Sequence, residues 1–214
     1  MVLLPRFAET PFRLLPTPAP LLGGLVLEYP TMIFQQVEKS TRHHPVYQAD
    51  VIDGISSARC QTPDLGHAPM SAALQELAYQ QLTPLIEDWV GEALERSWGY
   101  GVRSYGPGSR LHMHRDRVDT HVLSCIVHVA DQSNQPWPLD FIDHDAEHHQ
   151  VIFKPATMLF YESLCPHGRN SEFDGDFYRN MYFHWRPKTW DPSPYKQLTN
   201  TFADIDEARQ SMGG

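Results

Sequence analysis

The hydrophobic pattern of the chain changes from a helical to a strand-like period near Gly99. Before that point, the longest helical pattern begins at Ser71 and continues through Ala72–Leu77. Pro84 interrupts this pattern and is predicted to begin a second helix, because proline is tolerated in the first turn of a helix. The apolar residues that share one face of the second helix are Leu85, Trp89, Val90 and Leu94.

The first thirty residues contain six prolines, which disfavour a regular helix. This composition predicts an extended arm with one short strand around Leu25–Glu28. Residues Thr31–Ser40 are predicted to form a helix with Thr31 as its N-cap. Residues 41–68 show no regular pattern and are expected to be irregular.

After Gly99 the chain consists of short segments rich in Val, Ile, Phe and Tyr, separated by Gly, Pro, Asp and Asn. These predicted strands are Tyr100–Tyr105, Arg110–His114, His121–Val129, Leu139–Ile142, Gln150–Phe153, Thr157–Tyr161 and Phe177–Trp185. About seven closely spaced strands are typical of a small barrel or a two-sheet jelly roll.

We therefore expect one structural domain of mainly β class with flanking helices. Residues 1–98 would form an N-terminal arm and supporting helices, and residues 99–190 the β-rich core. Residues 191–214 would form a tail that ends in a short helix.

Composition limits the function classes. Hydrophobic residues make up 41% and charged residues 20% of the chain, as in globular proteins. The formal net charge of -9 argues against a nucleic-acid or membrane-surface partner. Three cysteines without a C-x-x-C pattern, no signal-peptide pattern and no long apolar stretch lead us to expect a cytoplasmic protein.

Three residues could hold a metal ion. Side chains two apart on a strand share a face, so His114 and Asp116 would project together. His167, 51 residues later, could supply a third ligand from a distant strand. Two histidines and one carboxylate favour Fe(II), with positions open for a co-substrate and O₂.

The H-x-D spacing alone is a weak signal, since it occurs often by chance. A second frame is also open, because His112 has the same strand parity as His114. A carboxylate ligand favours the frame with Asp116, and His112 would then line the pocket or support the ligands.

Several ordered features surround this pattern. Tyr105 and a Gly/Pro turn precede H-x-D by nine residues, an apolar strand follows at Val122–Val129, and another at Pro155–Phe160 precedes His167-Gly168. Arg179 and, six residues later, Trp185 lie on the last predicted strand. Over residues 99–187 this order resembles the prolyl 4-hydroxylase branch of the 2-oxoglutarate, Fe(II)-dependent dioxygenases.

The resemblance implies a double-stranded β-helix with Fe(II) held by His114, Asp116 and His167. It implies that Arg179 anchors the distal carboxylate of 2-oxoglutarate, which a planar guanidinium can pair with two hydrogen bonds. Tyr105 and His128 would also lie in the co-substrate pocket; the alternatives are a core histidine at His128 and a Tyr105 ring that packs within the barrel. The interval from His167 to Arg179 is longer than usual in that family, so Arg169 is a rival anchor.

The same resemblance implies hydroxylation of an unactivated C–H bond with O₂ and 2-oxoglutarate. The substrate would be a small molecule or a peptide, with a prolyl residue or a free amino acid as candidates. Side chains that could line its pocket are His112, Trp137, Tyr161, Tyr182 and Trp185. The alternatives are a cupin-like metal enzyme that does not use 2-oxoglutarate and a non-catalytic ligand-binding β-barrel. The oligomeric state cannot be read from the sequence.

Overall fold

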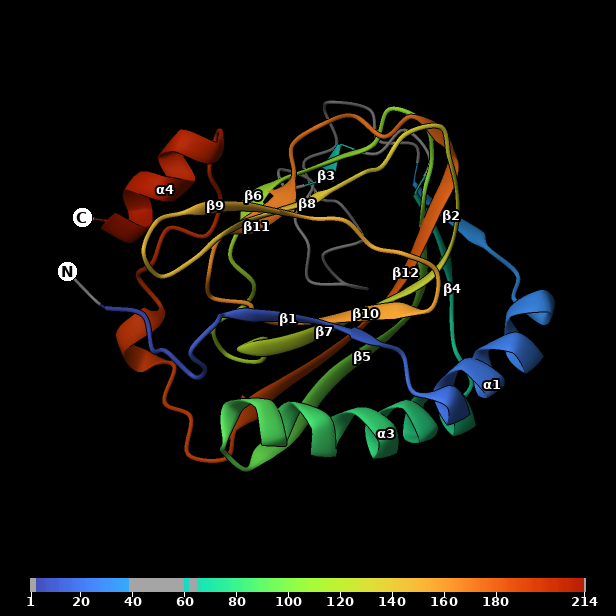
Figure 1. The fold of residues 1–214 in the computed structure, drawn as a ribbon, viewed down its shortest axis with the longest axis horizontal. Coiled ribbons are helices and arrows are strands. Elements are labelled where there is room, and N and C mark those ends of the chain that lie inside the picture. Colours follow the sequence, from blue (N-terminus) through green and yellow to red (C-terminus); the bar gives the residue numbers. More distant parts are fainter. Residues whose placement is uncertain (1–2, 39–59, 62–64, 214) are drawn as a thin grey trace.

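The computed structural model describes residues 3–38, 60–61 and 65–213. Within these residues, two antiparallel sheets form the body of the molecule (Figure 1), one of seven strands in the order β1-β10-β7-β12-β5-β4-β2 and one of five in the order β3-β6-β11-β8-β9. The strands are β1 (Phe12–Pro16), β2 (Gln35–Glu38), β3 (Cys60–Gln61), β4 (Leu65–Ala68), β5 (Leu94–Tyr105), β6 (Arg110–His114), β7 (Leu123–Ser133), β8 (Leu139–Ile142), β9 (His148–Val151), β10 (Thr157–Glu162), β11 (His167–Arg169) and β12 (Gly175–Pro187). The predicted mainly β class with flanking helices is confirmed.

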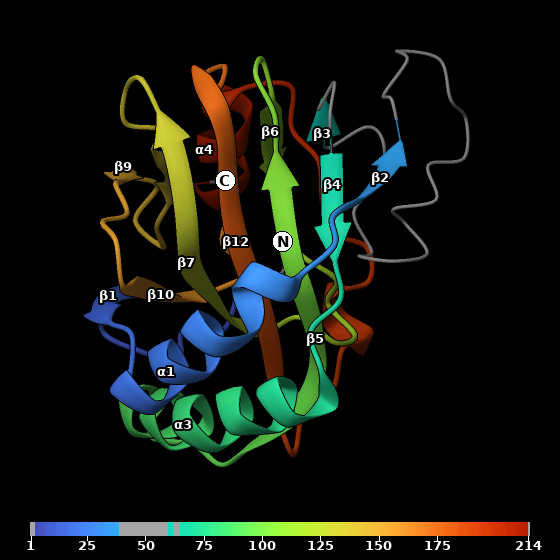
Figure 2. The same ribbon diagram turned by 90° about the vertical axis from the view of Figure 1, so that its right-hand side faces the viewer.

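The long strand β12 organises the larger sheet. It pairs with β5 on one side and with β7 on the other. The smaller sheet lies over one face of the larger one, and the helices α1 (Ala19–Glu28) and α3 (Ala72–Val90) cover the other face (Figures 1 and 2). One face of β12 therefore points into the space between the sheets, and its other face points toward the helices.

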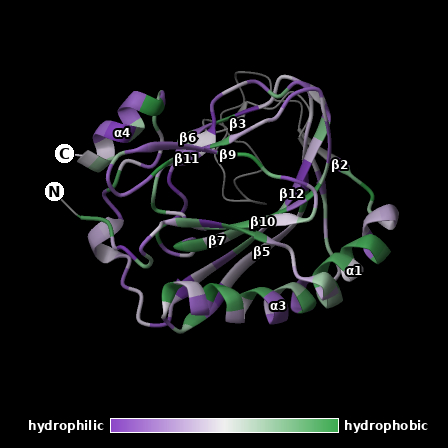
Figure 3. Ribbon diagram, in the orientation of Figure 1, coloured by the Kyte–Doolittle hydropathy of each residue, from purple (hydrophilic) through white to green (hydrophobic). Residues whose placement is uncertain are grey.

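The helix α3 (Ala72–Val90) covers the outer face of the larger sheet. The Ser71 hydroxyl accepts a hydrogen bond from the Leu74 amide at 3.1 Å, and Gly91 ends the helix with φ of 69°. Hydrophobic and hydrophilic residues alternate around the helix (Figure 3), and its buried side includes Leu82 and Ile86.

The prediction that Pro84 separates two helices was wrong. Pro84 lies inside α3. Proline removes one backbone hydrogen bond, but the apolar residues on both sides of it pack against the sheet and keep the helix continuous.

The prediction of a strand around Leu25–Glu28 was also wrong, because Ala19–Glu28 forms helix α1. Pro20 stands in the first turn, where it costs no hydrogen bond. Leu21 and Leu25 are buried with α3, and the two helices approach closely at Gly24. The prolines of this segment thus precede or begin the helix rather than break it.

Two further differences concern the edge of the larger sheet. Instead of a helix at Thr31–Ser40, the short 3₁₀ turn η1 (Tyr29–Thr31) leads into β2, which pairs with β4. The strand β4 lies within the segment expected to be irregular and pairs with β5. Ladder hydrogen bonds to a neighbouring strand override a weak local pattern here. Residues 39–59 and 62–64 lie outside the described residues.

The predicted strands after Gly99 are all present, with ends shifted by a few residues. The strands β1 and β11 were not predicted, and β1 pairs with β10, so the N-terminal arm contributes to the larger sheet. The turn η2 (Ser193–Tyr195) precedes the predicted C-terminal helix α4 (Ile205–Gly213), whose Ala208 packs with Met113 of β6. Within the described residues, no helix combines the length and hydrophobicity that crossing a membrane requires.

Candidate metal centre

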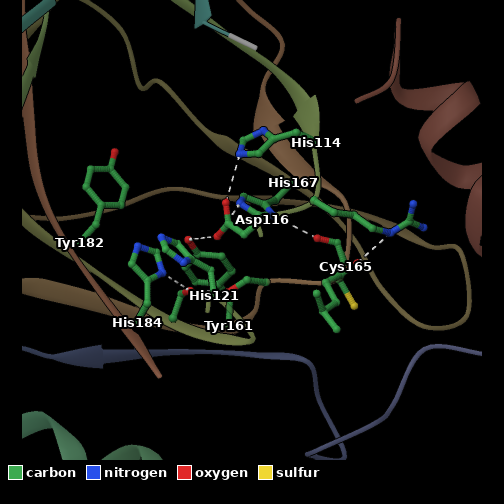
Figure 4. Close-up of polar contacts among 12 residues, drawn as sticks. His114, Asp116, His121, Tyr161, Cys165, His167, Tyr182 and His184 are labelled. Carbon is green, nitrogen blue, oxygen red and sulfur yellow. Dashed lines mark hydrogen bonds and ion pairs between the residues drawn. The ribbon is translucent and has the colours of Figure 1, made fainter. Parts of the chain in front are cut away.

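The residues His114, Asp116 and His167 meet at one end of the smaller sheet. His114 ends β6, His167 begins β11, and the two residues are paired across the antiparallel strands. The Asp116 carboxylate lies between the two rings (Figure 4), with Oδ1 3.5 Å from His114 Nε2 and Oδ2 3.7 Å from His167 Nε2. One ligand atom from each side chain falls within 4.8 Å of the others.

Backbone carbonyls orient both imidazoles. His114 Nδ1 lies 2.7 Å from the carbonyl of His112, and His167 Nδ1 lies 3.0 Å from the carbonyl of Cys165. A carbonyl can only accept, so each Nδ1 donates, and each Nε2 is the nitrogen left to face Asp116 and a metal. The residues therefore fit a divalent ion at this position.

The carboxylate of Asp116 is ionised in this setting. Burial alone would raise its pKa, but the imidazoles of His167 and His114 outweigh burial and hold the pKa well below the ordinary value of 3.8. The Tyr161 hydroxyl donates a long hydrogen bond of 3.5 Å to Oδ2. This geometry supports the frame with Asp116. His112 supports His114 through its backbone, and its side chain does not line the cavity.

A cavity between the two sheets contains the three residues. Besides them, it is lined by Tyr100, Arg103, Leu111, Arg117, His121, Ile126, Leu139, Tyr161, Arg169, Tyr182 and His184. Of the predicted pocket residues, Tyr161 and Tyr182 line it. Trp137 does not line it and packs against the Arg169 guanidinium, 4.5 Å from the ring centre.

Trp185 was predicted to line the pocket, but it lies on the other face of β12. It is fully buried in the core under α3, and its indole nitrogen donates to Thr83 Oγ1 at 3.0 Å. Alternate residues of a strand point to opposite faces, so Tyr182 and His184 point inward while Trp185 points outward.

Arg179 has the same strand parity as Trp185 and also points outward. Its Nε donates to Ser104 Oγ at 3.1 Å, its Nη1 donates to the Tyr29 hydroxyl, and its guanidinium covers the Phe34 ring. The prediction that Arg179 anchors 2-oxoglutarate is therefore corrected, because the side chain does not reach the cavity.

Arg169, the rival anchor, lies two residues beyond His167 and on the same face of β11. Its side chain is 1% exposed and lines the cavity. Nη1 donates to the carbonyl of Trp137, whereas Nη2 has no hydrogen-bond partner among the residues that the structure describes. A buried guanidinium nitrogen without a partner is costly, and an anionic ligand would satisfy it.

Tyr105 and His128 were predicted beside the co-substrate. The Tyr105 hydroxyl accepts a hydrogen bond from Arg103 Nη1 at 2.9 Å and lies 3.0 Å from the Tyr182 hydroxyl. This places Tyr105 directly behind the cavity wall. Both ring nitrogens of His128 are engaged, by Asn180 at 3.1 Å and by Asp131 at 3.2 Å.

The sequence pattern did not indicate two histidines that line the cavity, His121 and His184. The rings of His121 and His184 contact each other at a tilt of 31°, with their centres 3.8 Å apart. The Tyr100 hydroxyl lies 3.0 Å from His121 Nε2, and the Ser124 hydroxyl lies 2.6 Å from His184 Nδ1. Burial, followed by the neighbouring His121, holds the pKa of His184 well below the ordinary 6.5. Alternation along the predicted last strand could have indicated His184, because it has the parity of Tyr182.

Comparisons with known proteins establish the fold. No protein-family model and no curated protein matches the sequence. Similar solved structures include HygX from Streptomyces hygroscopicus with nickel, 2-oxoglutarate and hygromycin B bound (13% identity, 86% of this chain and 85% of that chain, TM-score 0.57). They also include AviO1 from Streptomyces viridochromogenes Tue57 (13%, 87% and 94%, TM-score 0.58) and a Pseudomonas putida prolyl-4-hydroxylase (13%, 84% and 94%, TM-score 0.55). The chain thus has the double-stranded β-helix fold of 2-oxoglutarate, Fe(II) oxygenases, as predicted.

Proposed function

We propose that the protein is an Fe(II)- and 2-oxoglutarate-dependent oxygenase that oxidises an unactivated C–H bond. The proposal rests on the two imidazole nitrogens and one carboxylate that converge within 4.8 Å in a buried cavity. This ligand set suits non-haem Fe(II) and leaves positions open. When bound, Fe(II) and 2-oxoglutarate would supply the activation of O₂, with the co-substrate leaving as succinate and CO₂.

Arg169 would hold the distal carboxylate of 2-oxoglutarate. Its unpartnered Nη2 can donate to a carboxylate oxygen, and the packed aromatic rings around it fix the guanidinium plane. Arg103 and Arg117 also line the cavity, and Asp116 is the one carboxylate among its described lining residues. Binding of an anionic co-substrate at Arg169 depends on this local geometry rather than on the acidic charge of the whole chain.

The remaining wall of the cavity would meet the substrate that is oxidised. It presents hydrogen-bonding side chains, namely Tyr100, His121, Tyr182 and His184, beside Asp116. Such a wall suits a polar small molecule or a polar group of a peptide, and a prolyl residue or a free amino acid stays a candidate. The similar structures include both a hygromycin B complex and a prolyl-4-hydroxylase, so they support both substrate classes.

The test is formation of succinate from 2-oxoglutarate by protein reconstituted with Fe(II) without oxygen and then exposed to air. We expect slow succinate formation by the wild type and a loss of more than about 100-fold in Asp116→Ala, since even a residue that only supports a metal ligand is worth about 10- to 100-fold. Asp119→Ala is the matched control, because this carboxylate is exposed and pairs with Lys196.

Three results would contradict the proposal. They are a wild-type protein that binds no Fe(II), an Asp116→Ala variant that keeps wild-type Fe(II) affinity, and equal losses in both variants. Oxidation of a substrate without succinate formation would favour the cupin-like alternative.

A further inference from the structure

A second group of metal-ligating side chains lies outside the cavity. His144 stands in the turn between β8 and β9, Glu162 ends β10, and Cys165 lies in the loop before β11. The side chains of His144 and Glu162 are 6% and 2% exposed, and Cys165 is fully buried. In Figure 4, Cys165 lies on the opposite side of Asp116 from His121 and His184, so its thiol is separate from the cavity.

The distances among these three side chains approach those of a tetrahedral ion. His144 Nε2 lies 3.7 Å from Cys165 Sγ and 2.8 Å from Glu162 Oε2, and one ligand atom from each residue falls within 4.8 Å of the others. Ordinary zinc–ligand lengths at a tetrahedral angle separate sulfur and nitrogen by about 3.6 Å and nitrogen and oxygen by about 3.3 Å. The distance from His144 Nε2 to Cys165 Sγ already fits this geometry. The distance from His144 Nε2 to Glu162 Oε2 would have to increase by about 0.5 Å.

The surroundings of Glu162 leave one carboxylate oxygen for a ligand. Its Oε1 accepts hydrogen bonds from the backbone amides of Phe7 at 3.1 Å and Ala8 at 3.0 Å. Oε2 therefore faces His144 and Cys165. Ligating carboxylates are usually held by such additional hydrogen bonds, which fix their orientation.

We infer that His144, Glu162 and Cys165 form a second metal-binding site, with solvent as the fourth ligand. A set of one sulfur, one imidazole and one carboxylate oxygen suits Zn²⁺. The ion would connect the N-terminal arm, which reaches Glu162 at Phe7 and Ala8, to the β8–β9 turn and to the loop that leads into β11 at His167. The inference stands independently of the proposed oxygenase activity, because the two sites share no ligand.

The experiment uses Co²⁺ as a spectroscopic probe on the metal-free full chain. A thiolate bound to Co²⁺ gives a charge-transfer absorption, and the centre at His114, Asp116 and His167 contains no sulfur. We expect this absorption in the wild type and in Asp116→Ala, and its loss in Cys165→Ser and in His144→Gln. Glutamine can still donate a hydrogen bond to Glu162, so the second variant separates ligation from folding. Cys60→Ser is the control and should keep the absorption.

Zinc stoichiometry gives the second readout. We expect two Zn²⁺ per wild-type chain, one in Cys165→Ser and one in Asp116→Ala, and a higher melting temperature of the wild type with Zn²⁺ than of Cys165→Ser with Zn²⁺. A wild type without the thiolate absorption, or an absorption that follows Cys60 rather than Cys165, would overturn the inference. The three side chains would then be a hydrogen-bonded anchor for the N-terminal arm.

Discussion

The two faces of β12 have different tasks although they belong to one strand. The inner face carries Tyr182 and His184 into the cavity that holds the candidate metal centre. The outer face carries Arg179 and Trp185 toward the helices and the sheet edge. A shift of one residue therefore separates a side chain that can reach a ligand from one that can only contribute to stability.

This difference between the two faces explains why the sequence pattern favoured Arg179 over Arg169 as the anchor of 2-oxoglutarate. The spacing of six residues between Arg179 and Trp185 is even, so both side chains must lie on the same face. The match to the family pattern thus placed both residues on the last strand but not on its inner face. The inner guanidinium comes instead from β11, at Arg169, which lies on the cavity side with His167.

The largest expected effect is on stability, at the outer face. Trp185 is fully buried and packs edge-on against Tyr79, with the ring centres 5.4 Å apart. Its indole nitrogen donates a hydrogen bond to the Thr83 hydroxyl. Trp185→Ala should lower the free energy of unfolding by about 3–5 kcal/mol, as measured by urea unfolding. The folded fraction should keep its 2-oxoglutarate turnover within about twofold, since outer-face residues touch no ligand. Unchanged stability with lost turnover would break the distinction between the faces.

The next largest expected effect, on the KM for 2-oxoglutarate, distinguishes Arg169 from Arg179. Arg169→Met should raise the KM for 2-oxoglutarate by about 10- to 100-fold, because a charge-assisted hydrogen bond is worth about 1.5–3 kcal/mol. Arg179→Met is the matched control on the outer face, and its KM should stay within about twofold of the wild type. Steady-state succinate formation measures both. A larger rise in Arg179→Met than in Arg169→Met would restore Arg179 as the anchor.

The β-rich half of the fold could be predicted because its strands carry strong local signals. The apolar segment Leu139–Ile142 stands between turn residues, and its pattern predicted both ends of β8 correctly. The N-terminal third could not be predicted in the same way. At α1 the prolines predicted an extended arm, but the burial of apolar side chains against α3 stabilises a helix. At β4 and β11 the strand exists through pairing with β5 and with β6, which no local pattern records.

The candidate site shows the same limit. The H-x-D pair could be proposed from strand parity, because His114 and Asp116 are near each other in sequence. The partners supplied by other strands could not be fixed by spacing alone, and Arg103 and His121 gave no signal that stood above the other residues of their strands. Their place in the cavity follows from how β5 and the segment before β7 face the smaller sheet.

The smallest predicted effect is a pH dependence of stability that arises from His184 on the inner face of β12. The pKa of buried His184 lies well below its ordinary 6.5, because burial and then His121 disfavour its charged form. Below about pH 6.5 the unfolded chain takes up a proton at this residue while the folded chain does not, so the folded state loses stability as pH falls. Between pH 7.5 and 5.5 the metal-free wild type should lose about 1.4 kcal/mol more than His184→Gln, as measured by urea unfolding. Trp185→Phe, a change to a non-titrating residue on the outer face, should keep the wild-type pH dependence. An equal pH dependence in wild type and His184→Gln would mean that His184 takes up a proton as readily in the folded protein as in the unfolded chain, and would contradict the lowered pKa.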